Sequence, residues 1–417
     1  MEKIKKLARA VLIGLSSFHL NERSSNEKIV IASAVSALFA APGAVFAQAK
    51  PPAVPTLSQI FESSGITESG YIDAGYGYIK NGAGFVGQRV FDQNPNSFAL
   101  NQVGLTMAKQ PKEGFGGLVN ITVGRDAQFI HSFPEVNTAA PGTGNSTSMF
   151  DITQAYAQYA GGPLTVIVGK FTTLHGTEVI ASTGNVNISR SILFGSVPFT
   201  HTGVRATWAL SDTFSLIAGV NNGWDQLTDA NKGKTLELGL TANPIKPLNI
   251  ALSAYSGKEN FAQSGALLAG PDGTRTSVDL VVSYQITDPF SIGIEYLNVQ
   301  QKNYVSLADG STMTGKFSGF AGYITYMFSP KFRGTVRLES FDDKDGVRFG
   351  QPVGPGEVTG AQKFKEATLT VAYLPADSFE LRAEVRQDSA DQKSFSDSQG
   401  NASKSQSSVA LSGIYKF

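Results

Sequence analysis

The sequence predicts an all-β fold, a transmembrane antiparallel β-barrel of sixteen strands, on three observations. Sixteen stretches alternate between apolar and polar residues, and the connections between them alternate between long and short. The chain also ends on such a stretch, in which Val409, Leu411, Tyr415 and Phe417 share one face. A strand between lipid and a water-filled lumen needs one apolar face only, with aromatic residues where lipid meets water. A terminal Phe of this kind is typical of bacterial outer-membrane barrels, so we expect Tyr415 and Phe417 to form the assembly signal.

The composition of the 417 residues fits one large barrel better than two or three soluble domains. Charged residues make up 16% of the chain, compared with about 25% in ordinary soluble proteins. The chain has 44 Gly, 27 Phe and 13 Tyr, which suits small residues in the wall and aromatic girdles at its edges. It has no Cys, which excludes thiol catalysis, disulfides and cysteine metal sites.

Residues 1–47 are predicted to be an export signal. Six basic residues precede the apolar stretch at 29–40. Val45-Phe46-Ala47 then offers small residues at the cleavage position. The alternative, a membrane helix over 29–47, is interrupted by Ser33, Ser36, Pro42 and Gly43. Residues 48–65 are expected to form a periplasmic lead-in, and residues 66–417 the barrel. Without residues 1–47 the chain keeps 28 basic and 31 acidic residues, a balance that argues against a nucleic-acid partner.

The predicted strands span most of the chain after residue 65, with bounds uncertain by a few residues. They lie at 66–80, 97–109, 114–126, 151–160, 163–170, 201–210, 213–222, 234–242, 247–257, 275–286, 289–300, 315–328, 331–341, 364–374, 378–388 and 405–417. Seven of the connections are short and rich in turn residues, and eight are long. Short and long connections alternate strictly, as expected for periplasmic turns and extracellular loops, and an even strand number places both ends of the barrel in the periplasm.

The strand from Phe379 shows most clearly why one face meets lipid and the other meets water. Leu381 and Val385 alternate there with charged side chains, which no soluble core would accept. A charge on the lipid face would cost roughly 2–4 kcal/mol near the midplane. Sixteen strands leave an aqueous channel unless something fills it, and we expect the longest loop, 171–200, to fold into the lumen.

The charged residues of this loop and of the lumen face are the candidates for a pore constriction that sets solute size and selectivity. They are Lys170, Glu178, Arg190, Arg205, Arg333, Arg337, Glu339, Glu380, Arg382, Glu384 and Arg386. Two other interpretations remain open at this point. Opposite charges on neighbouring strands are ordinary stabilising pairs, and Glu178 and Arg190 could instead attach the loop to the wall.

Several runs in this part of the chain resemble a known family. They are Gly169-Lys170-Phe171, His175-Gly176-Thr177-Glu178, residues 187–194 with Asn-Ile-Ser-Arg-Ser, residues 198–205 with Pro-Phe-Thr-His-Thr-Gly, and Asn221-Asn222-Gly223-Trp224-Asp225. These runs resemble the β-barrel porin family known as OmpL-like or porin-2, over about residues 57–417. The resemblance implies a porin of the bacterial outer membrane and brings no established catalytic residues.

The function expected from these observations is a water-filled channel for passive diffusion of small hydrophilic solutes and ions, without catalytic, metal or cofactor residues. The expected partners are outer-membrane lipid, the solutes and ions themselves, the barrel-assembly machinery and, by analogy with general porins, two further copies in a homotrimer. A surface receptor or adhesin that acts through its loops is the main alternative. A hydrolase is a weaker one, because pairs such as Ser191 with His201, or Ser189 with His175, lack an acid that would orient the histidine.

Two short motifs do not match a functional site in full, and for the second, incidental binding of a divalent cation at the surface remains the alternative. Residues 82–87 match the spacing of a dinucleotide-binding loop, but a new strand follows them where a helix would be required. Asp342, Asp343 and Asp345 resemble part of a calcium loop, yet its first and twelfth positions would be Phe341 and Pro352.

Overall fold

The structure is a computed structural model, and it describes residues 56–80, 89–92, 95–133, 148–259, 272–305, 311–349, 351–354, 357–396, 399 and 401–417. The predicted export signal and most of the lead-in therefore lie outside the described residues. The end of the lead-in forms helix α3 (Leu57–Ser64), which the sequence analysis did not predict. Among the helices described, none has the length and hydrophobicity that crossing a membrane requires.

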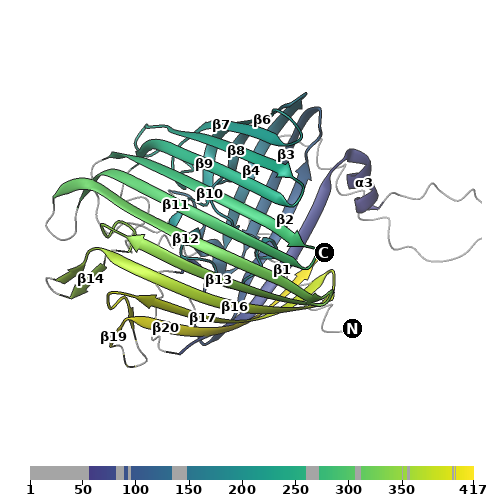
Figure 1. Cartoon of the computed structure of the whole chain (residues 1–417). Helices are drawn as coiled ribbons and strands as arrows, with labels where there is room; N and C mark the ends of the chain where they lie inside the picture. The colour runs from purple at the N-terminus through teal and green to yellow at the C-terminus, as the bar shows by residue number, and fades with distance from the viewer. Residues whose placement is uncertain are drawn as a thin grey trace, which may run out of the picture. The chain divides into compact units, whose positions relative to one another are not determined.

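Sixteen strands close into one antiparallel barrel in sequence order (Figure 1), and the predicted fold is confirmed. The strands are β1 (Thr67–Ile79), β2 (Ser97–Lys109), β3 (Gly114–Val123), β4 (Phe150–Gly161), β5 (Leu164–Thr172), β6 (Thr200–Ala209), β7 (Phe214–Asn221), β8 (Thr235–Ile245), β9 (Leu248–Glu259), β10 (Gly273–Thr287), β11 (Phe290–Val305), β12 (Thr312–Ser329), β13 (Phe332–Asp343), β16 (Gln362–Ala376), β17 (Phe379–Ala390) and β20 (Ser405–Lys416). The barrel closes between β1 and β20, where Gly70 and Phe417 exchange two backbone hydrogen bonds of 2.8 and 2.9 Å.

The long loops contain elements that the sequence analysis missed. Two short hairpins, β14 (Gln351–Gly354) with β15 (Glu357–Thr359) and β18 (Phe395–Ser396) with β19 (Ala402–Ser403), lie within the predicted loops at 342–363 and 389–404. Among the described residues, three short 3-10 helices lie in other connections: η2 (Arg125–Phe129), η3 (Ser182–Gly184) and η4 (Phe194–Ser196). Figure 1 shows the β14 and β19 hairpins at one end of the barrel and the C-terminus at the end with the short turns.

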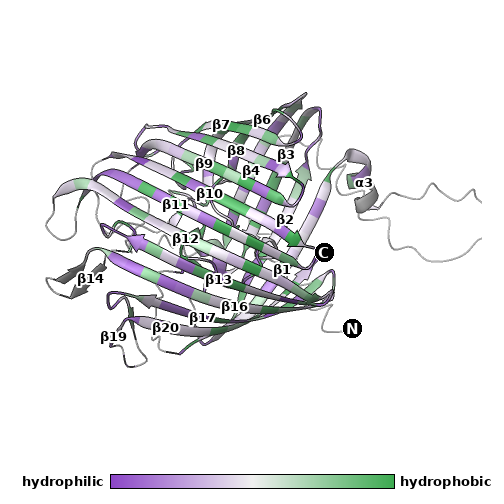
Figure 2. Ribbon diagram, viewed as in Figure 1, coloured by the Kyte–Doolittle hydropathy of each residue, from purple (hydrophilic) through white to green (hydrophobic). Residues whose placement is uncertain are grey.

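The two faces of the wall differ as the alternation predicts. On β17, Leu381, Ala383 and Val385 are exposed, while the charged residues between them are buried. Figure 2 shows this alternation as green and purple bands along the strands. Aromatic pairs such as Phe115 with Tyr159, Phe332 with Tyr373 and Tyr415 with Phe417 lie near the short turns, with ring centroids 4.9 to 6.0 Å apart. Exposed rings at this level are the aromatic girdle of a membrane barrel.

The main hydrophobic core lies inside the barrel, where residues between β5 and β6 pack against inward side chains of β11–β13. Ile192, Leu193 and Val197 share one buried cluster with Leu297, Val299, Phe317, Ala321 and Phe341. An empty sixteen-stranded barrel would expose these apolar side chains to water. Because contact between residues 192–197 and the wall removes these apolar side chains from water, it stabilises the inward position of residues 192–197.

Candidate constriction site

Residues 173–199, here called the docked segment, connect β5 to β6 and contact the inner wall. Apart from two 3-10 turns, η3 and η4, the docked segment has no regular secondary structure. Its backbone N–H and C=O groups therefore need partners outside a helix or sheet. Charged and hydroxyl side chains of the wall supply them.

The first attachment is to β9–β11. The His175 ring nitrogens lie 2.6 Å from Ser253 Oγ and 2.8 Å from Ser277 Oγ. The next two backbone N–H groups, of Gly176 and Thr177, donate to Asp279 (2.9 Å) and Glu295 (2.8 Å). Burial, together with the neighbouring His201, lowers the pKa of His175 to about 3. The ring is thus neutral at physiological pH, and one nitrogen donates while the other accepts.

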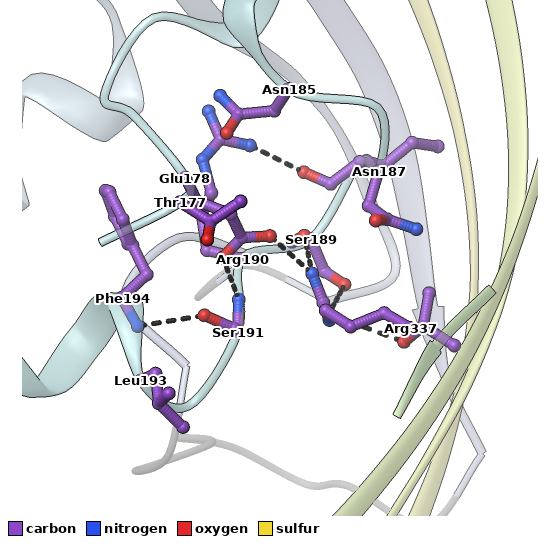
Figure 3. Close-up of polar contacts among 12 residues, drawn as sticks. Thr177, Glu178, Asn185, Asn187, Ser189, Arg190, Ser191, Leu193, Phe194 and Arg337 are labelled. Atoms are coloured by element: carbon purple, nitrogen blue, oxygen red, sulfur yellow. Dashed lines mark hydrogen bonds and ion pairs between the residues drawn. The ribbon is translucent and has the colours of Figure 1, made fainter. Parts of the chain in front are cut away.

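The second attachment is Arg337 on β13, whose side chain has no exposed surface. Its guanidinium donates to Glu178 (2.7 Å) and to the Ser189 carbonyl (2.8 Å), as Figure 3 shows. On the wall side it forms ion pairs of 3.2 Å with Glu339 and with Glu366. Glu339 in turn accepts the Ile192 N–H at 2.7 Å. One arginine thus links two parts of the docked segment to two strands.

The third attachment is the inner face of β17. Arg382 donates to the carbonyls of Ser182 and Asn187, both at 3.1 Å, and Arg386 donates to the Arg190 carbonyl at 2.6 Å. Glu384, between them, accepts the N–H groups of Ile188 (2.7 Å) and Ser189 (3.0 Å). Hydrogen bonds to charged groups are the strong ones, so β17 binds this stretch of backbone firmly.

Arg190 stabilises the docked segment itself. Its guanidinium donates to the carbonyls of Val179, Ile180 and Ile188, and it lies over the rings of Phe91 and Phe194 at 5.2 and 5.7 Å. Gln102 of β2 attaches the docked segment to the wall on a further strand. Its amide nitrogen donates to the Ile180 carbonyl (2.9 Å), and its amide oxygen accepts the Ser182 N–H (3.1 Å).

Three of the predicted basic residues lie away from these contacts. Lys170 donates to Asp151 (3.3 Å) and to the Ile152 carbonyl (2.8 Å). Arg205 pairs with Glu237 through two bonds of 2.6 and 3.1 Å and lies over the Phe171 ring. Arg333 pairs with Glu380, which also binds Arg382, and its side chain keeps 15% of its surface exposed.

The described residues offer little for other chemistry. They contain no group of three or more His, Asp or Glu side chains that could hold a metal ion. His175 contacts Ser253 and Ser277 and not Ser189, and His201 donates from Nδ1 to the Gly223 carbonyl at 3.0 Å. Neither ring forms an ion pair with a carboxylate among the described residues, so neither has the acid partner of a catalytic triad.

Comparison with known proteins agrees with this architecture. The sequence profile of the beta-barrel porin-2, OmpL-like family matches residues 65–417. The chain belongs to this family. It is therefore an outer-membrane porin, a channel for passive diffusion of small hydrophilic solutes and ions. Among curated protein sequences, no match was found.

Solved structures of similar fold are porins and channels of the outer membrane. The outer membrane channel DcaP of Acinetobacter baumannii superposes with a TM-score of 0.56 at 16% identity, covering 84% of this chain and 97% of that chain. An anion-selective porin from Comamonas acidovorans gives 0.57 at 11% identity, with 84% and 99% covered. OmpT of Vibrio cholerae, in its trimer form, gives 0.54 at 12% identity, with 84% and 99% covered. At these identities the structural similarity supports only the fold of this porin and does not extend to the selectivity or assembly of the compared proteins.

Several partners of the charged residues in this porin were not predicted from the sequence. Glu366 lies between Arg337 and Arg386, Asp388 binds both Arg386 and Arg89, and Glu237 binds Arg205. Glu366, Asp388 and Glu237 each occupy an inward position of their strand under the predicted alternation, so the sequence could have identified them as lumen residues. Asp279 and Glu295 could also have been placed on the inner face, but nothing in the sequence showed that they accept backbone N–H groups of the docked segment.

Proposed function

We propose that solutes cross this porin along one side of the lumen, between the docked segment and the inner faces of β3–β8. The observation that carries this proposal is the one-sided attachment of residues 175–193. In the described part of the chain, their hydrogen bonds to the wall go to β2, β9–β11, β13, β16 and β17.

The inner face on the other side supports the same pathway. Toward the short turns, inward residues of β3–β8 such as Thr165, Thr207, Ser215 and Thr241 are small, polar and partly exposed. Nearer the loops, inward residues of the same strands such as Thr122, Thr235 and Glu237 are buried. Small polar side chains around water suit passive diffusion of hydrophilic solutes.

In this proposal the arginines of β13 and β17 set the width of the constriction by holding the docked segment in place. On the open side, Arg205 of β6 is paired with Glu237 of β8. On the attached side, Arg333, which is partly exposed, is paired with Glu380. Paired charges contribute little net field, so we expect weak ion selectivity, in contrast with the similar porin that is described as anion-selective.

We also propose a homotrimer, as in the trimer form of OmpT, and assembly through the C-terminal aromatic residues. Tyr415 and Phe417 are exposed on the outer face of the last strand. The trimer proposal is supported by the outward faces of β2, β4 and β7, where Phe98, Phe150 and Val220 remain apolar up to the loop side.

Single-channel recording in planar bilayers tests the pathway. Wild type should give ohmic steps, and Arg382→Ala/Arg386→Ala should give larger and noisier steps with little change in reversal potential, because the docked segment is released. A strong shift of reversal potential toward cations would instead place these arginines on the solute path. A folded, heat-modifiable barrel without current would overturn the proposed pathway and favour a receptor or adhesin.

A further inference from the structure

Two carboxylates that contact the docked segment have no cationic partner. Asp279 on β10 and Glu295 on β11 each keep only 1% of their surface exposed. Glu237 and Glu366 pair with arginines, whereas no ion pair of Asp279 or Glu295 occurs within the described residues. A buried carboxylate is very costly unless it is paired, protonated or bound to a metal ion. Something other than a neighbouring side chain must therefore compensate for these two charges.

The strand register places the two carboxylates next to each other. β10, β11 and β12 are consecutive neighbours in the barrel (Figure 1). Asp279 pairs with Leu297, and Glu295 pairs with Val281, so the two acids are diagonal neighbours on the inner face. Diagonal positions of this kind lie about 7–8 Å apart, within reach of two side chains.

Each carboxylate binds the docked segment with one oxygen and leaves the other without a partner. Asp279 Oδ1 and Glu295 Oε2 accept the N–H groups of Gly176 (2.9 Å) and Thr177 (2.8 Å). Asp279 Oδ2, Glu295 Oε1 and Thr177 Oγ1 are buried and have no hydrogen-bond partner within the described residues. Donation by an N–H group favours the ionised form of a carboxylate, so a cation suits these oxygens better than protons do.

An independent indication of a ligand comes from Tyr323 on β12. Tyr323 is diagonal to Glu295 on the inner face, because Glu295 pairs with Ala321. Its side chain is 7% exposed, and in the described part of the chain its hydroxyl has no hydrogen-bond partner. The hydroxyl interacts electrostatically with Glu178 and Glu295. Since a buried tyrosine hydroxyl usually finds a partner, this unpaired group indicates a further polar species beside Glu295.

The backbone of the docked segment leaves room at this place. Gly176 has a φ of +93°, and a Cβ built on it would have the Glu178 carbonyl oxygen (3.6 Å) and Glu295 Oε1 (3.8 Å) as its nearest atoms. The two oxygens therefore border one small space. Gly176 and Thr177 are partly exposed, so this space can be reached from the lumen.

We propose that a calcium ion binds between Asp279 and Glu295 and holds the docked segment against β10 and β11. The protein ligands are Asp279 Oδ2, Glu295 Oε1, Thr177 Oγ1 and the Glu178 carbonyl oxygen, and water completes the shell. The two carboxylate charges match a divalent ion. Calcium accepts six to eight oxygen ligands in irregular geometry, whereas magnesium requires a near-ideal octahedron. Zinc is disfavoured, because both nitrogens of the nearby His175 are hydrogen-bonded to serines.

The test measures calcium binding to the full chain, refolded in detergent without lipid and treated with a chelator. The site variant carries Asp279→Asn and Glu295→Gln, which keep an oxygen acceptor for the N–H groups of Gly176 and Thr177. The matched control carries Asp342→Asn and Asp345→Asn, two acids of the motif that resembles part of a calcium loop. Isothermal titration with calcium chloride gives affinity and stoichiometry, and thermal unfolding is followed with and without calcium chloride.

We expect wild type to bind a single calcium ion, the site variant to bind it roughly tenfold more weakly or worse, and the control to bind as wild type does. Calcium should raise the unfolding temperature of wild type but not of the site variant. After chelation the site variant should be the more stable of the two, because it has no unpaired charge at positions 279 and 295.

No calcium binding by wild type, equal binding by the site variant, or an equal loss in the control would each overturn the proposal. A wild type whose stability depends on pH but not on calcium would overturn it too, since protons would then neutralise the two carboxylates. The wild-type titration decides even if the site variant does not fold, which heat-modifiability shows. Binding is measured without solute transport, so a failure here is distinct from a failure of the proposed pathway.

Discussion

The two sides of the lumen use charge in different ways. On β9–β17, arginine and glutamate side chains bind the backbone of the docked segment, and Arg337 alone contacts Glu178, Ser189, Glu339 and Glu366. On β3–β8, the Arg205–Glu237 pair binds within the wall and has no bond to residues 175–193. Similar residue types in the same strand pattern thus bind the docked segment on one side and pair within the wall on the other, where we propose that solutes pass.

The difference teaches that a charged lumen residue is not a selectivity residue by its position alone. A side chain that is fully buried and satisfied by backbone groups presents little field to a passing ion. Such groups are nonetheless sensitive to substitution, because removing one member of a buried network leaves the others unpaired. Four substitutions or conditions, taken from the largest expected effect to the smallest, can separate attachment from selectivity.

Arg337→Met should have the largest effect on stability. It leaves Glu178, Glu339 and Glu366 buried without their common partner, which is expected to lower the free energy of unfolding by about 3–5 kcal/mol. Urea unfolding of the refolded barrel in detergent micelles measures the loss. Arg333→Met is the matched control, because Arg333 is partly exposed and Glu380 keeps Arg382 as a partner. Equal losses in the two variants would contradict the attachment role of Arg337.

Acid pH should weaken the attachment at His175. The unfolded chain takes up a proton at this residue near pH 6.5, whereas the folded chain does so only at about pH 3. The unfolded state therefore binds more protons in this window, and stability falls as pH falls, by about 2 kcal/mol between pH 6.5 and pH 5. The difference between wild type and His175→Asn across this range isolates the residue from other titrating groups. Parallel pH profiles would show that His175 is not buried as described.

Selectivity should respond on the open side more than on the attached side. Arg205→Gln leaves the Glu237 carboxylate without its cation, so the reversal potential under a salt gradient should shift toward cations, with a roughly twofold change in permeability ratio. Arg386→Gln should shift it less, because Arg386 is buried against the Arg190 carbonyl and Asp388. The reverse order of effects would place the solute path on the β17 side.

Phe417→Ala should have the smallest effect on the folded barrel. The side chain is 60% exposed on the lipid face, and the backbone bonds to Gly70 do not require it. We expect less than about 1 kcal/mol of lost stability and unchanged conductance after refolding, but a reduced amount of heat-modifiable barrel in cell membranes. A normal cellular amount would contradict the proposed assembly signal.

The local pattern predicted the strands well. All sixteen predicted strands are present, with bounds within a few residues. The prediction succeeds because side chains alternate between the two faces of a strand at successive residues, so the sequence of a single segment shows the alternation. The hairpins β14–β15 and β18–β19 and helix α3 were missed. The strands of the hairpins are two to four residues long and α3 has eight residues, and all lie in segments predicted to be loops or lead-in.

The sequence by itself determined that this chain is a sixteen-stranded membrane barrel and which side chains face its lumen. Only the tertiary structure decided what those side chains do. Arg205 and Arg337 stand at equivalent inward positions of their strands, yet one pairs across the wall and the other binds residues 148 to 159 positions away. The reason is physical: alternation is a property of neighbouring residues, whereas the partner of a buried charge depends on where an irregular segment comes to lie against the wall.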